Sequence, residues 1–165
     1  MRSIIMGLIA LITWDLNAQI MNKPNEVVIA LFVATDQRDW SGVRATFDEK
    51  VWLDYSSMNG SPATELTPEQ IITAWQGILP GFESTHHQLG NFIHSIDGDE
   101  ARVFCYGTAA HFLTDEKGNL WTVVGTYDFV LQEKAGDWKI SSMKFNFKYQ
   151  DGNTSLPERA MARAK

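Results

Sequence analysis

The sequence predicts an α+β domain in which N-terminal helices pack on a strongly curved, mostly antiparallel sheet. Helical apolar spacing and helix-start signals dominate the chain as far as Pro80. Long β-rich segments separated by short turns then follow from residue 84 onward. A bent sheet wrapped by helices forms a cone-shaped α+β barrel, and the open mouth of such a cone can enclose a pocket.

Length and composition bound the class of protein. The chain has 165 residues, 44% hydrophobic and 12% aromatic, which suits one globular domain with a sizeable core. Its formal net charge is −6 and no basic stripe is present, so nucleic acid is an unfavourable partner. The single cysteine, Cys105, cannot form an intrachain disulfide and is interpreted as a small core residue.

Residues 1–18 have the features of a secretory signal peptide. Arg2 precedes an apolar run, Ile4 to Trp14, that is too short to span a bilayer as a helix, and cleavage after Ala18 is predicted. The mature protein would then be secreted or periplasmic, with no membrane anchor. The alternative is a cytoplasmic protein that starts at Met21. In both cases the domain is predicted over residues 22–150, with 151–165 as a short, frayed C-terminal tail.

Two helices are predicted before the first strand. Pro24 suits the first turn of a helix whose apolar stripe ends near Asp36. Either Asp39 or Ser41 caps a short second helix that carries Val43 and Phe47.

A strand, a loop and a capped helix complete the first part of the chain. Residues 51–55 are rich in β-formers, and residues 56–66 are predicted to be a loop punctuated by Asn59-Gly60. Thr67 and Gln70 form a capping box around Pro68, and Pro80-Gly81 ends the helix that follows.

Four long strands are predicted at about 84–96, 100–113, 120–133 and 137–149, as an antiparallel meander. On the second of these strands, one face carries small residues and ends in His111. Small side chains leave volume, so this face is predicted to line a cavity with His111 projecting into it. On the last strand, Met143, Phe145, Phe147 and Tyr149 share a face. They form either the core face or an outer patch that needs a partner, and the second case would mean a homodimer or homotrimer.

Asp36 and His87 are the candidate catalytic pair. A carboxylate that accepts one imidazole N–H fixes the tautomer of the ring, and the other nitrogen is then a general base. Each residue also has an ordinary structural explanation: Asp36 as a cap at a helix end, and His87 as a half-buried strand residue. An Asp–His separation within hydrogen-bond reach favours catalysis, whereas a longer one or a plugged pocket favours a binding or association module.

The chain resembles the SnoaL-like branch of the nuclear transport factor 2-like superfamily. Helix, TDQRDW, short helix, strand ending LDY, capped helix and meander carry the resemblance, with GTYDFVLQEKAGDWKI typical of that branch. The site is similar to that of scytalone dehydratase, which implies catalytic roles for Asp36, Tyr55, His87 and His111. Other dehydratases and a dehydrochlorinase of the superfamily are similar in using an Asp–His base. Thr35 stands where scytalone dehydratase has a second tyrosine, so the substrate is expected to differ.

These roles define a lyase reaction. His87 takes a proton from carbon beside a carbonyl, Tyr55 donates to the carbonyl oxygen, and His111 supplies an acid to the leaving hydroxyl. Trp40, Trp75, Tyr127 and Asn91 are further candidates for substrate contact, with packing as the alternative for the tryptophans. The four histidines match no compact ligand spacing, so neither a metal nor a cofactor is expected.

The sequence therefore predicts a cofactor-independent, dehydratase-like lyase for a small hydroxy-carbonyl, polyketide-like or steroid-like substrate. Two alternatives remain open at this point. One is an isomerase or cyclase that uses the same base, and the other is a non-catalytic module for ligand binding or association.

Overall fold

The computed structural model describes residues 23–165, and the predicted signal peptide and alternative start lie outside that range. The elements run in the following order: α1 (Pro24–Gln37), α2 (Trp40–Thr46), β1 (Phe47–Asp54), α3 (Ser56–Asn59), β2 (Thr64–Leu66), α4 (Pro68–Gln76), the 3₁₀ turn η1 (Leu79–Gly81), β3 (Ser84–Asp97), β4 (Glu100–Phe112), β5 (Leu120–Lys134), β6 (Asp137–Gly152) and α5 (Leu156–Arg163). Within this range no helix is both long enough and apolar enough to cross a membrane.

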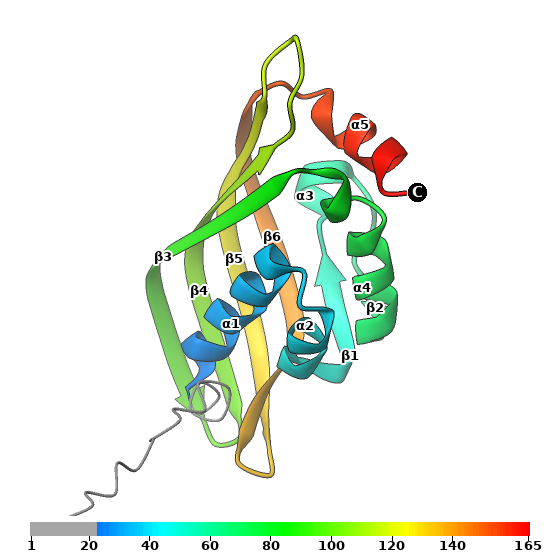
Figure 1. The fold of residues 1–165 in the computed structure, drawn as a ribbon. Coiled ribbons are helices and arrows are strands. Elements are labelled where there is room, and N and C mark those ends of the chain that lie inside the picture. The colour runs from blue at the N-terminus through cyan, green and yellow to red at the C-terminus, as the bar shows by residue number, and fades with distance from the viewer. Residues whose placement is uncertain (1–22) are drawn as a thin grey trace, which may run out of the picture.

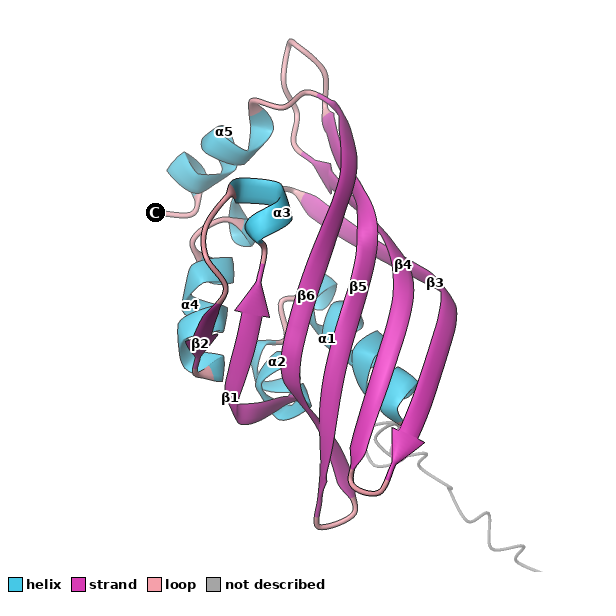
Figure 2. Ribbon diagram, turned by 180° about the vertical axis from the view of Figure 1, so that it is seen from behind, coloured by secondary structure: helices cyan, strands magenta, loops and turns pink. Residues whose placement is uncertain are grey.

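The sheet has six strands in the order β2-β1-β6-β5-β4-β3 and does not close (Figure 1). β1 runs parallel to β6, and the remaining neighbours are antiparallel. Helices α1 and α2 lie against one face, whereas Figure 2 shows the other face of β3–β6 without a covering helix among the residues drawn as ribbon. This is the predicted α+β cone with a mostly antiparallel sheet, in which β1 and β6 form the single parallel pair among the described strands.

Helix α1 anchors the covered face. Pro24 occupies its first turn, and Val27, Val28 and Leu31 are fully buried because their spacing keeps them on one side of the helix. The helix ends at Arg38, which adopts the left-handed conformation with φ 60° and ψ 23°. Asp39 then accepts a hydrogen bond from the Gly42 N–H and caps α2, so Asp39, and not Ser41, is the cap.

Alternation along β4 agrees with the sequence pattern. Ala101, Val103, Cys105, Gly107 and Ala109 are buried, while the alternate residues between them are exposed or half-buried. On β6, Met143 and Phe145 are buried, so their face belongs to the core, and Tyr149 is exposed near the end of the strand. The core interpretation of that face is therefore right for its first part.

Two predictions of irregular chain are wrong. The predicted loop 56–66 contains α3 and β2, and β2 forms because Leu53, Trp52 and Val51 of β1 provide it with a pairing edge. The predicted frayed tail contains α5, in which Leu156 and Ala160, one helical turn apart, are completely buried. Helix α5 packs on η1. In both cases the segment becomes regular because another element packs or pairs with it: β1 for β2, and η1 for α5.

Candidate functional site

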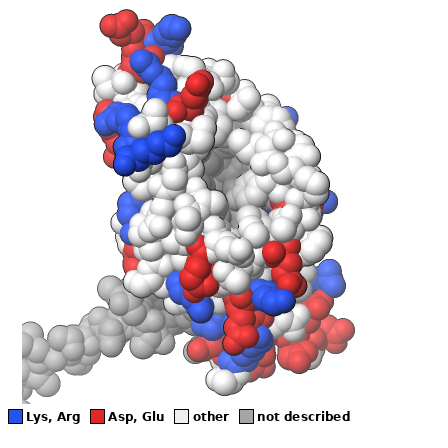
Figure 3. Space-filling model, turned by 90° about the vertical axis from the view of Figure 1, so that its right-hand side faces the viewer, with Lys and Arg blue, Asp and Glu red and all other residues white. Residues whose placement is uncertain are grey.

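A cavity of about 300 Å³ lies between the helices and the covered face of the sheet. Its lining comes from α1, α3, α4, η1 and four strands, and is mostly aromatic and aliphatic: Phe32, Thr35, Tyr55, Met58, Asn59, Trp75, Ile78, Leu79, His87, Ala109, His111, Trp121, Val123, Tyr127 and Phe145. Figure 3 shows a hollow on the side of the molecule that carries α3, α4 and α5, surrounded by uncharged atoms, with the charged side chains gathered above and below.

Asp36 and His87 meet at this cavity. The Nδ1 atom of His87 lies 2.7 Å from Asp36 Oδ1, and the backbone N–H of His87 donates to Asp36 Oδ2 at 2.7 Å. Asp36 comes from the last turn of α1 and His87 from β3, so the packing of α1 on the sheet sets their separation. The distance falls within hydrogen-bond reach, which is the geometry that the sequence prediction requires of a dyad.

The Asp36 carboxylate is held ionised. Burial by itself would raise its pKa, but the hydrogen bond and the charge of His87, the His87 N–H and the Thr85 hydroxyl together lower the pKa below the ordinary value. An ionised carboxylate only accepts, so Nδ1 of His87 carries the proton. The Nε2 atom of His87 has no hydrogen-bond partner among residues 23–165, and whenever the ring is neutral this atom carries the lone pair.

His111 is the second imidazole of the cavity. It is 5% exposed, and its ring stands edge-on to that of His87 with centroids 5.8 Å apart. Its Nδ1 lies 3.3 Å from the carbonyl oxygen of Trp121, which can only accept, so Nδ1 carries the proton here too. Burial, followed by the charge of His87, lowers the pKa of His111 to about 4. The ring is therefore neutral near pH 7, with a lone pair on Nε2.

Two tyrosines line the same cavity. Tyr55 follows the end of β1 and Tyr127 lies in the middle of β5, and both rings pack on Phe145, with centroids 5.9 and 4.8 Å from it. Burial raises the pKa of both phenols, so both stay protonated. Both residues line the cavity, and a protonated phenol can donate a hydrogen bond to a ligand held there.

The remaining predicted contacts separate into two groups. Trp75 lines the cavity. Thr35, which was not among the predicted contacts, lines it too, and its hydroxyl donates to the Leu31 carbonyl at 2.7 Å. Trp40 packs against the core instead, because it begins α2 on the far side of the chain reversal at Arg38. Asn91 is exposed and left-handed, with φ 53°, inside the bulge of β3 between Gly90 and Ile93. Neither Trp40 nor Asn91 lines the cavity.

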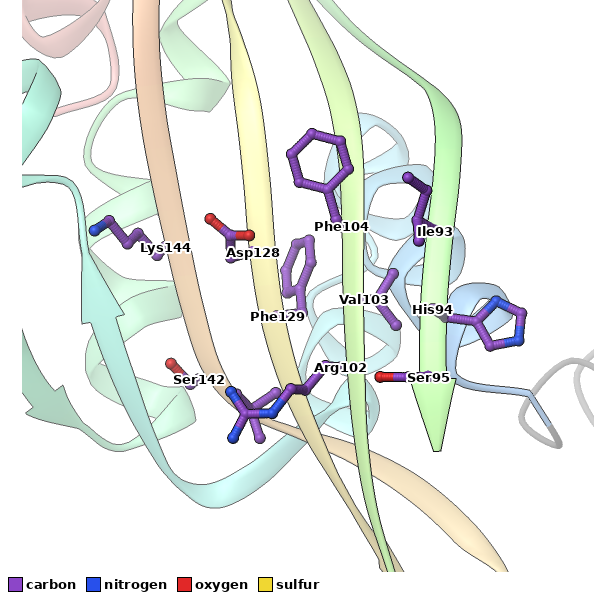
Figure 4. Close-up of a pocket in the computed structure, with 11 residues that line it drawn as sticks. Ile93, His94, Ser95, Arg102, Val103, Phe104, Asp128, Phe129, Ser142 and Lys144 are labelled. Atoms are coloured by element: carbon purple, nitrogen blue, oxygen red, sulfur yellow. The ribbon is translucent and has the colours of Figure 1, made fainter. Parts of the chain in front are cut away.

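A second cavity of about 340 Å³ lies on the other face of the sheet. Figure 4 shows its charged groups, Arg102, Asp128 and Lys144, spread across three strands and not converging on one point. Asp128 accepts a hydrogen bond from the Asn146 amide at 2.6 Å. In the part of the chain that the structure describes, no group of three or more His, Cys, Asp or Glu side chains is placed to hold a metal ion. The inner cavity is therefore the candidate site.

Sequence reasoning missed two residues that support the pair. Thr85 donates to Asp36 Oδ1 at 2.8 Å, and Arg38 donates to Thr85 Oγ1 at 2.8 Å. A signal for Thr85 exists, since it lies two residues before His87 and therefore on the same face of β3. The sequence carries no such signal for Arg38, because its side chain reaches β3 only through the fold.

The fold and the cavity define the class of protein: an open α+β cone with an imidazole–carboxylate pair inside it. The SnoaL-like domain family matches residues 25–144, well over half of the chain, so this protein belongs to that family. No sequence among the curated proteins matches it significantly.

Solved structures agree on the fold. The Kfla4162 protein of Kribbella flavida superposes with a TM-score of 0.75 at 25% identity, over 81% of this chain and 93% of its own. A scytalone dehydratase-like protein of Novosphingobium aromaticivorans gives 0.68 at 18% identity, over 78% and 84%. A hexachlorocyclohexane dehydrochlorinase, LinA type 2, gives 0.65 at 14% identity, over 79% and 86%. At the identities of the last two, the likeness establishes the fold alone.

Proposed function

We propose that this protein is a cofactor-independent lyase that eliminates water from a small hydroxy-carbonyl compound, with the Asp36–His87 pair as general base. The observation that carries the proposal is the 2.7 Å contact between His87 Nδ1 and Asp36 Oδ1 at the wall of a cavity. This contact fixes the tautomer that leaves a lone pair on Nε2, and neutral imidazole is the usual base for a proton on carbon.

The reaction begins with removal of a proton from the carbon beside the carbonyl. His87 Nε2 takes this proton, and the electron pair of the C–H bond moves toward the carbonyl oxygen. Tyr55 or Tyr127 donates a hydrogen bond to that oxygen and stabilises the enolate charge. Both phenols suit this role because burial keeps them protonated, as their raised pKa values indicate.

Loss of the hydroxyl completes the reaction. The electron pair returns to form the carbon–carbon double bond, the carbon–oxygen bond breaks, and the imidazolium of His87 gives its proton to the leaving oxygen. One water is released and His87 is again neutral. His111 accepts a hydrogen bond from the substrate hydroxyl and orients it, because its neutral ring presents a lone pair. This role replaces the acid predicted for His111 from the sequence.

The cavity favours an aromatic, polyketide-like substrate. Its volume of about 300 Å³ is at the small end for ligand sites, and aromatic rings form much of its wall. The dehydratase and dehydrochlorinase names of similarly folded proteins agree with elimination chemistry. An isomerase or cyclase would use the same base on a substrate without a leaving group, and the experiment below separates the two.

The test uses a panel of aromatic β-hydroxy ketones in deuterium oxide. Loss of water, followed by mass spectrometry, indicates a lyase, while exchange of the α-proton without loss of water indicates isomerase-type chemistry. Asp36→Asn and His87→Gln should each lower the rate by about 10²- to 10⁴-fold with the fold intact. His86→Gln is the matched control, because His86 is the exposed neighbour of His87 on the same strand. A variant of the pair that turns over at the wild-type rate would overturn the proposal.

A further inference from the structure

Arg38 occupies a backbone position that disfavours most side chains. It ends α1 with φ 60° and ψ 23°, in the left-handed region where helices commonly end in glycine. Glycine would adopt this conformation without steric strain. An arginine at such a position is explained if its side chain does something that glycine cannot do.

The Arg38 guanidinium connects three elements behind the candidate base. Nη2 donates to the carbonyl oxygen of Leu79 in η1 at 2.6 Å, and Nη1 donates to Thr85 Oγ1 in β3 at 2.8 Å. Nη1 also lies 3.3 Å from the Thr35 carbonyl of its own helix. A guanidinium has donors only and stays charged in proteins, so these contacts have fixed directions.

Thr85 passes this direction on to Asp36. Because the Thr85 hydroxyl accepts from Arg38, its single proton is free to be donated to Asp36 Oδ1, 2.8 Å away. Oδ1 also accepts from His87 Nδ1, and Oδ2 accepts from the His87 N–H. The carboxylate is thus held at both oxygens. Neither Thr85 nor Arg38 lines the cavity, so neither can touch a substrate held there.

We infer that Thr85 and Arg38 are positioning residues of the Asp36–His87 pair. Arg38 orients the Thr85 hydroxyl, and Thr85 fixes the Asp36 carboxylate so that Oδ1 stays directed at His87 Nδ1. The threonine also separates the guanidinium from Oδ1, where a direct ion pair would compete with the imidazole. The inference rests on the proposed role of the pair as general base, but the geometry it concerns exists without substrate.

The experiment compares Thr85→Val with Thr85→Ser. Valine keeps the shape and removes the hydroxyl, whereas serine keeps the hydroxyl. With any substrate that the protein turns over, kcat of Thr85→Val should fall about 10- to 100-fold while KM stays unchanged, because a hydrogen bond to a charged group is lost away from the substrate. Thr85→Ser should recover most of kcat. In the Asp36→Asn background, Thr85→Val should have little further effect, since the two residues act through one hydrogen bond.

A second readout needs no substrate. The experiment is to record the NMR signal of the proton on His87 Nδ1 in the free protein, and the hydrogen bond to Asp36 should place this signal far downfield. Thr85→Val should shift that signal upfield and speed its exchange with water, and Thr85→Ser should not. Failure to find any turnover would count against the proposed function alone, because this signal reports the positioning separately.

Two further variants distinguish positioning from general stability. Thr46→Val removes another buried threonine hydroxyl, one that donates to the Val43 carbonyl at 2.8 Å and not to Asp36, and it should leave kcat and the His87 signal unchanged. Arg38→Gly removes the guanidinium while supplying the residue that the backbone favours, so it should keep the fold and lose activity. A wild-type His87 signal together with a wild-type kcat in Thr85→Val would overturn the inference.

Discussion

At the residue scale, the two imidazoles of the cavity have the same tautomer for different reasons. An ionised carboxylate holds the Nδ1 proton of His87, and a backbone carbonyl holds that of His111. The Trp121 carbonyl carries no full negative charge that could balance an imidazolium at His111. Because His111 is also deeply buried, protonation of its ring is unfavourable, whereas a base must become protonated in each catalytic cycle. Of the two imidazoles, His87 is therefore suited to carry a proton and His111 is suited to accept a hydrogen bond.

The buried, neutral state of His111 makes stability depend on pH. Its pKa is about 4 in the folded protein and about 6.5 when unfolded, so between these values the unfolded chain binds more protons. Stability therefore falls as pH decreases through this range. Relative to His111→Gln, which lacks the titrating group, the wild-type protein should lose about 2 kcal/mol between about pH 7 and about pH 5.

Urea unfolding of both proteins at the two pH values measures this difference. Any effect of the substitution that does not depend on pH cancels, as do the contributions of groups common to both chains. An unfolding free-energy difference that stays constant with pH would mean that His111 titrates alike in the folded and unfolded states, and would remove the argument for a neutral ring.

Single residues of the site differ in how far the sequence could reveal them. Asp36, His87, Tyr55 and His111 stand in short patterns typical of the family, and strand parity places His87 and His111 on the inner face. The tautomer of His111 depends on the Trp121 carbonyl of the neighbouring strand, and the orientation of the Arg38 side chain depends on the Leu79 carbonyl in η1. Neither feature follows from local sequence. These hydrogen bonds end at backbone carbonyls of other elements, and only the fold determines where those carbonyls lie.

At the element scale, the termini of helices follow from local chemistry and the docking of short segments does not. The capping box of α4 is present as predicted, because Thr67 and Gln70 satisfy each other's backbone N–H groups. In contrast, α5 buries only Leu156 and Ala160, while its other long apolar side chain, Met161, is exposed. Leu156 and Ala160 have a burial partner only because η1 lies next to them in the fold.

The contact between α5 and η1 is close enough to test with a single methyl group. A Cβ atom on Gly81 would collide with the backbone carbonyl of Ala160, and Arg163 faces Glu83 at 3.7 Å on the same interface. Gly81→Ala should therefore displace α5 and destabilise the protein by about 1–3 kcal/mol. Hydrogen exchange of residues 156–163 should become faster, because the helix loses its support.

Gly90→Ala is the matched control for this prediction. Gly90 lies in β3, has open space around its added Cβ and does not require a positive φ. It should leave both the free energy of unfolding and the exchange of α5 close to wild type. Equal behaviour of the two variants would mean that α5 is not packed on η1 in solution.

At the scale of the whole molecule, the cone is solid at one end and hollow at the other. β4 contributes to both parts with the same type of side chain on the same face. Ala101 is completely buried in the core, and Ala109 lines the cavity opposite His87 in the strand register. The alternation of β4 was visible in the sequence, but the position at which core gives way to cavity was not, since it depends on how closely the helices pack against the sheet at each point along the strand.

This division predicts opposite consequences for the same substitution. Ala101→Leu adds volume to a close-packed region and should cost about 1–3 kcal/mol, because neighbouring side chains must shift. Ala109→Leu adds the same volume to empty space, so it should cost less than about 1 kcal/mol or stabilise the protein, since the new methyl groups gain contacts. Ala109→Leu should also raise KM for any substrate, because it reduces a cavity of about 300 Å³. Urea unfolding of both variants measures the comparison. Equal destabilisation by the two substitutions would show that the open end of the cone is packed in solution. The cavity that the proposed reaction requires would then be absent.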